Sequence, residues 1–149
     1  MQTLKIQIPE GFQIDNVDVN SGEIKFKPVP KDVRERFKTV KDVLAHHLLT
    51  EEEFDEKCED LTPDEKAYRF LKMLVQCLNE GWQPDWNNDN QPKYYAWFYM
   101  GGSSGFRSYD CAAWRSNSGV GSRLCFINYD TAEYVGNQFI ELYKEYFLM

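Results

Sequence analysis

The sequence has little of what catalytic and metal centres are usually built from. It contains only two histidines, His46 and His47, and adjacent residues on a helix point to different faces. Its four cysteines form no C-x-x-C pair, so the spacings of zinc ribbons and thioredoxin-like sites are absent. A G-x-S-x-G nucleophile elbow is absent as well. We therefore expect no metal, no cofactor and no catalytic residue, and we favour a protein that is not an enzyme.

The sequence also lacks the apolar segments that mark export or membrane insertion. No run approaches the roughly 18 apolar residues of a membrane span. The first residues, MQTLKIQIPEG, alternate like a strand and contain no apolar signal-peptide segment. We expect a cytoplasmic protein that does not bind membranes. Cys111 and Cys125 fall on neighbouring predicted strands, where a disulfide is geometrically conceivable, but a reducing cytoplasm favours free thiols.

Excess positive charge is missing too. The formal net charge is −7 and the pI is about 4.9, so the average surface repels phosphate and passive binding of nucleic acid is disfavoured. Acidic residues concentrate between Glu51 and Glu65. This segment is interpreted first as a solvated helical face and second as an acidic surface that imitates nucleic acid or binds a basic partner.

Alternation with a period of two dominates the first thirty residues. Leu4, Ile6 and Ile8 alternate with polar residues, which predicts a half-buried strand. The pattern returns on both sides of a turn at residues 20–22. We expect a small antiparallel hairpin that ends at the prolines of residues 28 and 30.

Capping boxes then mark a helical middle. The pairs Thr39 and Asp42, Thr50 and Glu53, and Thr62 and Glu65 each place a hydroxyl three residues before a carboxylate. The third pair precedes Pro63 and an i, i+3, i+4, i+7 apolar stripe that continues to Gly81. The pattern predicts a largely buried helix over residues 63–80.

The C-terminal half predicts three strands and a helix. Strands are expected at 93–100, 106–114 and 124–128, and Asp130 is expected to cap a helix over 131–147. Gly136 in mid-helix indicates close approach of another backbone. The predicted fold is one α+β domain over residues 1–149, with an N-terminal β-hairpin, a helical middle, and a three-stranded antiparallel meander packed against helices 63–80 and 131–147.

Aromatic rings and arginines gather in this second half. Aromatic faces with interspersed arginines are typical of stacking recognition and of protein interfaces. We expect most of these rings to belong to the core and a minority to form a surface for a protein partner or for a second copy of the chain. The candidate binding residues are Trp82, Trp86, Trp97, Tyr99, Arg107, Trp114, Arg115 and Arg123. The alternative is a small enzyme with a pocket around Arg107, Asp110 and Arg123.

Three strings carry a resemblance to a known group. They are LKIQIPEGFQID near the start, LNEGWQPDWNNDNQPKYYAWF in the middle, and VGSRLCFINYDTAEYVGNQFIELYKEYF near the end. Together they resemble a family of small uncharacterised proteins of Bacteroidetes genomes, prophages and mobile elements. The resemblance implies a cytoplasmic, phage-associated context. It implies no activity, ligand or site residue.

Overall fold

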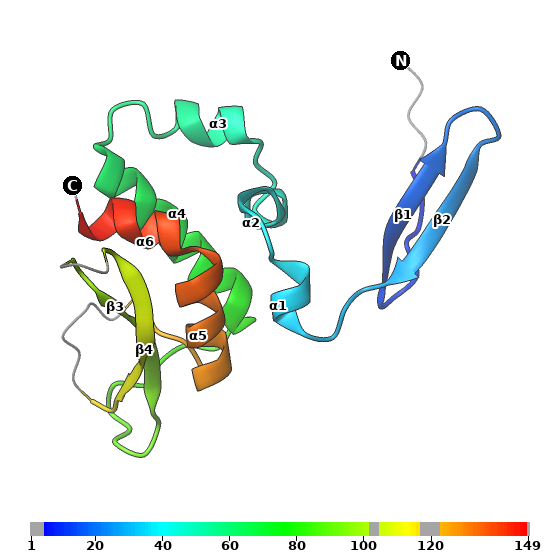
Figure 1. The fold of residues 1–149 in the computed structure, drawn as a ribbon. Helices are drawn as coiled ribbons and strands as arrows, with labels where there is room; N and C mark the ends of the chain where they lie inside the picture. Colours follow the sequence, from blue (N-terminus) through cyan, green and yellow to red (C-terminus); the bar gives the residue numbers. More distant parts are fainter. Residues whose placement is uncertain (1–4, 102–104, 117–122, 149) are drawn as a thin grey trace.

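Two antiparallel β-hairpins and six helices form the part of the chain that this computed structural model describes, which is residues 5–101, 105–116 and 123–148 (Figure 1). The predicted α+β class is confirmed. None of the helices within these residues combines the length and the apolarity needed to cross a membrane.

The first hairpin pairs β1 (Phe12–Asp18) with β2 (Glu23–Pro28) and stands to one side of the other elements (Figure 1). The hairpin was predicted correctly, but its half-buried character was not. Most of its side chains are exposed, and the core of the described residues begins only at Phe37. The strand expected from Leu4, Ile6 and Ile8 does not form: residues 5–9 lie outside any strand, and Leu4 is not among the described residues. Alternation alone cannot show whether a partner layer exists.

Short helices connect this hairpin to the core. They are α1 (Val33–Arg36), α2 (Val40–His46) and α3 (Glu51–Glu56). The predicted capping boxes of α2 and α3 are both present, with Thr39 paired to Asp42 and Thr50 to Glu53. These caps provide hydrogen-bond partners for backbone N–H groups at the starts of α2 and α3. Helices of this length are too short to be stable alone.

The central element is α4 (Pro63–Asn79), as the sequence predicted. The Glu65 carboxylate accepts a 2.9 Å hydrogen bond from the Thr62 backbone N–H at its start. At its end, Glu80 and Gly81 both adopt left-handed conformations, which terminates the helix. Its apolar face is fully buried, and Leu71 and Leu74 have no exposed surface. Burial of one such leucine is worth about 1.5–3 kcal/mol.

The predicted three-stranded meander is wrong. Among the described residues of the C-terminal half, two strands form a ladder, β3 (Lys93–Tyr99) and β4 (Arg107–Trp114). The expected third strand, 124–128, makes a single antiparallel bridge between Phe126 and Tyr94, with hydrogen bonds of 2.8 and 3.1 Å. That bridge lies on the edge of β3, not on the edge of β4 as a meander requires.

Asn79 binds the opposite edge of this segment. Its side-chain amide donates to the Cys125 carbonyl at 2.8 Å, and its side-chain oxygen accepts from the Ile127 N–H at 3.2 Å. These two backbone groups point away from Tyr94, towards the side that a further strand would occupy. One buried side chain thus satisfies the two backbone groups on the edge of this segment that faces away from β3.

The predicted terminal helix is two helices. They are α5 (Tyr129–Gln138) and α6 (Ile140–Phe147). The helix is interrupted at Phe139, whose φ of −114° is not helical. Asn128, not Asp130, caps α5, because its side chain accepts the Thr131 N–H at 2.8 Å. This interruption lets α5 lie on the β3–β4 hairpin while α6 lies along α4 (Figure 1).

Gly136 of α5 lies close to another element, but the predicted approach of a backbone is wrong. A Cβ at this glycine would lie 3.0 Å from the Ala96 Cβ and 3.2 Å from the Ser108 Oγ, so the contact is with side chains of β3 and β4 and not with a backbone. The core below it is aromatic, with Phe98 4.6 Å from Tyr143 and 5.1 Å from Phe106 between ring centres. The β3–β4 hairpin therefore has one face sealed by helices.

Candidate functional site

The outer face of the β3–β4 hairpin, opposite the helices, carries most of the candidate residues. Tyr94, Ala96 and Phe98 pack towards the helices, so Trp97 and Tyr99 point outward. A bulge inserts one extra residue in β4, because Trp97 pairs with Asp110 while Phe98 pairs with Ser108. The extra residue between them is Tyr109.

Three exposed rings and one arginine meet on this face, and we call them the β3–β4 aromatic cluster: Trp97, Tyr99, Tyr109 and Arg107. Ring centres are 4.4 Å apart for Tyr99 and Tyr109 and 6.1 Å apart for Trp97 and Tyr109. The Arg107 guanidinium lies 4.0 Å from the centre of the Tyr99 ring. The side chains of Trp97 and Tyr109 are 56% and 55% exposed. The cluster is an ordered aromatic patch that faces solvent.

Tyr109 is the member of this cluster that the sequence did not reveal. Strict alternation places it on the same face as Cys111, towards the helices. The bulge reverses that direction. A hydrogen bond to Tyr99 is the main cause that raises the pKa of Tyr109, so its phenol stays protonated at neutral pH.

The other end of the outer face is covered by the turn that precedes β3. Lys93 is 0% exposed. Its ammonium donates to the Asn88 carbonyl at 3.1 Å and lies 5.4 Å from the centre of the Trp86 ring. Arg115 closes the same turn with a 2.9 Å hydrogen bond to the Asp89 carbonyl. Arg115 has a structural role here.

A second group of candidates surrounds a pocket of about 400 Å³ at the end of α4. Trp82, Trp86 and Arg123 line it together with Lys72 and Gln76 of α4. Trp82, Pro84 and Trp86 form one wall of this pocket. The sequence offered no signal that Lys72 would join this group, because its partners come from distant segments.

The eight predicted binding residues therefore separate into two sites and a remainder. Three of them, Trp97, Tyr99 and Arg107, belong to the aromatic cluster, and three, Trp82, Trp86 and Arg123, line the pocket. Trp114 lies opposite Lys93 at the end of the ladder, partly exposed, next to Arg115.

The alternative function, a small enzyme, needs Arg107, Asp110 and Arg123 to surround one pocket, but each of these side chains makes a different contact. Arg107 stacks on Tyr99, and Arg123 lines the pocket. Asp110 accepts hydrogen bonds from the Tyr129 hydroxyl at 2.9 Å and from the Cys111 N–H at 2.7 Å. The bond to Asp110 is the main cause that raises the pKa of Tyr129 to about 12. The tyrosine is thereby held as a proton donor to the carboxylate.

One cysteine–histidine contact has the spacing of a catalytic pair. The Cys77 Sγ lies 3.5 Å from the Nε2 of His47, which also lies 3.2 Å from the Met73 carbonyl oxygen. A carbonyl only accepts, so Nε2 must carry the hydrogen that this contact requires and cannot also take a proton from the thiol. Burial raises the pKa of Cys77 to about 11, which keeps the sulfur protonated. The pair is structural.

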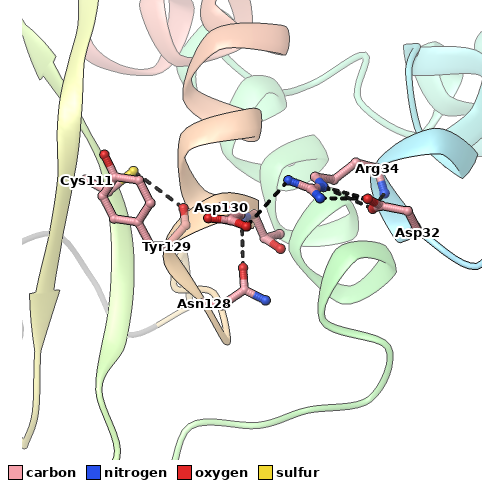
Figure 2. Close-up of polar contacts among 7 residues, drawn as sticks. Asp32, Arg34, Cys111, Asn128, Tyr129 and Asp130 are labelled. Carbon is pink, nitrogen blue, oxygen red and sulfur yellow. Dashed lines mark hydrogen bonds and ion pairs between the residues drawn. The ribbon is translucent and has the colours of Figure 1, made fainter.

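Cys111 and Cys125 are protonated as well. No disulfide joins any of the four cysteines. Cys111 donates to the Tyr129 carbonyl at 3.8 Å (Figure 2), and Cys125 is buried. Burial raises the pKa of Cys111 to about 12 and that of Cys125 to about 11. Over residues 5–101, 105–116 and 123–148, no group of three or more His, Cys, Asp or Glu side chains is placed to hold a metal ion.

A polar network beside these residues joins α1 to α5. Figure 2 shows Arg34 between two carboxylates, with Asp32 at 2.7 Å and Asp130 at 3.9 Å. The Arg34 hydrogen bond lowers the pKa of Asp32 to about 2. Because Asp32 also caps α1 and Asp130 lies in the first turn of α5, the network fixes the two helix starts.

The acidic segment is partly used in local structure. Glu53 and Glu65 close capping boxes, and Asp55 forms a 2.8 Å ion pair with Lys66. Carboxylates held in this way are less available to an external partner. The interpretation as a solvated helical face accounts for them.

Comparison with protein-family models found no match, and comparisons with curated proteins and with solved structures found none either. The functional assignment therefore depends on the geometry of the chain's own residues.

Proposed function

We propose that this protein is a non-enzymatic binding protein that recognises a protein partner through the β3–β4 aromatic cluster. The observation that carries the proposal is the stacking of Arg107 on Tyr99 beside the exposed rings of Trp97 and Tyr109. Tryptophan, tyrosine and arginine are the residues most enriched in the energetic centres of protein interfaces. The contacts among these rings restrict their rotamers before binding, which reduces the entropy lost on association.

The charge of the chain favours a protein over a nucleic acid as the partner. Stacking platforms for single strands combine rings with a positively charged groove. Arg107 is the one cation among the four cluster residues, Asp110 lies beside Trp97 across the ladder, and the net charge is −7. A peptide segment with apolar side chains and a carboxylate fits this patch better, because rings cover its apolar part and Arg107 pairs with its charge.

The setting of the protein is also a proposal. The resemblance to phage-associated Bacteroidetes proteins supports an origin in a prophage or mobile element and a cytoplasmic location. Two other functions rank lower. Imitation of nucleic acid by Glu51–Glu65 ranks lower because several of these carboxylates are engaged in ion pairs and helix caps. An enzyme around Arg107, Asp110 and Arg123 ranks lower because these three side chains make separate contacts.

Affinity capture with matched variants tests the proposed surface. The double variant Trp97→Ala, Arg107→Ala removes one ring and the cation, and both positions are exposed, so the fold should be retained. The control is Leu48→Ala, Lys144→Ala, which removes one exposed apolar side chain and one cation elsewhere. We expect wild type and control to recover the same partner from lysate of the source cells and the cluster variant to lose it. Equal recovery by a correctly folded cluster variant would refute the assignment.

A further inference from the structure

The pocket at the end of α4 differs in charge from the rest of this acidic protein. Its described lining consists of residues from α4, from the turn at 81–86, and from residues 123 and 125, and none of them is acidic. Two are cationic, Lys72 and Arg123. Its volume of about 400 Å³ lies within the usual range of small-molecule sites. An electropositive hollow in a chain of net charge −7 needs an explanation.

Among the described residues, neither cation is paired with a carboxylate. The ion pairs in this part of the chain involve neither Lys72 nor Arg123. The Lys72 side chain lines the pocket, and its ammonium lies 4.8 Å from the centre of the Tyr68 ring, one turn earlier on α4. A bound anion would supply the counter-charge that these two side chains lack here.

A third cation lies behind the pocket wall. The Lys93 ammonium is fully buried, and among the described residues it has a carbonyl and a ring as partners but no carboxylate. Its ring partner, Trp86, lines the pocket, and its charge also reaches Cys125, another lining residue. A buried cation without a counter-ion is costly, and an anion in the adjacent pocket would offset that cost.

The end of α4 opposes this positive potential only in part. A helix carboxyl terminus contributes about half a negative charge, whereas the lining residues Lys72 and Arg123 each carry one full positive charge. The balance favours an anion. The indoles of Trp82 and Trp86 in the same wall add flat apolar surfaces on which a ring can stack.

We propose that this pocket binds a small aromatic anion, that is, a planar ring that carries a phosphate or a carboxylate. The ring lies against Trp82 and Trp86, and the anionic group lies between Arg123 and Lys72. The pocket shares no residue with the β3–β4 aromatic cluster, so this site is independent of the proposed protein-binding surface.

Calorimetric titration with four probes tests the proposal: AMP, adenosine, inorganic phosphate and indole-3-acetate. Adenosine has the ring without the charge, and phosphate has the charge without the ring. We expect saturable binding of AMP, of indole-3-acetate or of both, with adenosine and phosphate each weaker by about tenfold or more. Preference for AMP identifies a nucleotide-like ligand, and preference for indole-3-acetate identifies an aromatic carboxylate; both results support the site.

Two charge variants locate the binding. Arg123→Gln and Lys72→Gln should each weaken the binding of the preferred probe by about tenfold, whereas Lys144→Gln, the same change on α6, should leave it unchanged. Both lining side chains are at least partly exposed, so the fold should persist. The proposal is overturned if neither aromatic anion binds up to its solubility limit. It is also overturned if adenosine or phosphate binds as tightly as the anions, or if Arg123→Gln and Lys72→Gln bind like the wild type.

Discussion

The side-chain amide of Asn79 donates a 2.8 Å hydrogen bond to the backbone carbonyl of Cys125, and its oxygen accepts one from the next residue but one, Ile127. The last residue of α4 thus holds the segment that leads from the pocket to α5. Asn79 is 6% exposed, so neither of these bonds can be replaced readily by water.

Replacing this asparagine should be strongly destabilising. Asn79→Ala leaves two backbone groups of the 125–127 segment without partners, each at a cost of about 1–3 kcal/mol. We expect the free energy of unfolding to fall by about 2–4 kcal/mol in urea denaturation. Asn137→Ala, which removes an exposed amide on α5, is the matched control and should change it by less than about 0.5 kcal/mol. Similar losses for the two variants would contradict the role of Asn79.

Gly136 should tolerate no side chain without movement of the β3–β4 hairpin. Gly136→Ala gains about 1 kcal/mol of helix propensity but places a Cβ 3.0 Å from that of Ala96, and such overpacking costs about 1–3 kcal/mol. We expect a net loss of about 1 kcal/mol in the same assay.

A double-mutant cycle identifies the contact responsible. Adding Ala96→Gly removes the atom that the new Cβ meets, so the two substitutions together should cost at least about 0.5 kcal/mol less than the sum of their separate effects. Strictly additive effects would show that the strain arises elsewhere.

The N-terminal hairpin should be dispensable for the stability of the rest. No residue before Val33 belongs to the described core or packs against it, and a hollow of about 540 Å³ lies between the hairpin and α1 and α2. A two-stranded hairpin alone is marginally stable in water. A chain that starts at Lys31 should keep a cooperative thermal unfolding transition, with a stability within about 1 kcal/mol of the full chain. Loss of that transition would mean that β1 and β2 stabilise the core.

Acid should weaken the cap of α1 that Asp32 forms with Arg34. The pKa of Asp32 is lowered to about 2, chiefly by hydrogen bonds from Arg34, from the usual value near 3.8. A carboxyl whose pKa is depressed in the folded state stabilises the fold above its unfolded pKa, and this contribution is lost as the pH falls from about 4 towards 2. Carboxyl NMR titration should show Asp32 titrating near pH 2 in the wild type. In Arg34→Gln its midpoint should return towards 3.8; an unchanged midpoint would contradict the assigned cause.

Local signals in the sequence predicted local structure well. The capping boxes at Thr39 and Thr50 and the long helix from Pro63 depend on neighbours three or four residues apart, so sequence spacing contains the information. The exposed rings Trp97 and Tyr99 were also among the predicted binding residues. The failures are of another kind.

Several failed predictions involve contacts between distant segments. The 124–128 segment, expected next to β4, bridges to Tyr94 of β3 instead, and Asn79, which lies 46 residues from Cys125, binds its other edge. The bulge that turns Tyr109 outward leaves no mark on the alternation of β4. The burial of Lys93 depends in the same way on the turn that covers it. Sequence spacing cannot show which segment will lie on top of another.

The central claim is that the β3–β4 aromatic cluster contacts a protein partner, and site-specific photo-crosslinking tests it most directly. The photoreactive residue p-benzoylphenylalanine replaces Trp97 in the cluster or Leu48, which is 90% exposed and remote from it. In source cells, the probe at position 97 should give one discrete adduct that is lost when Arg107→Ala and Tyr109→Ala are added. The probe at position 48 should not give that adduct. No adduct at position 97, the same adduct at both positions, or an adduct that persists in the folded variant would contradict the account.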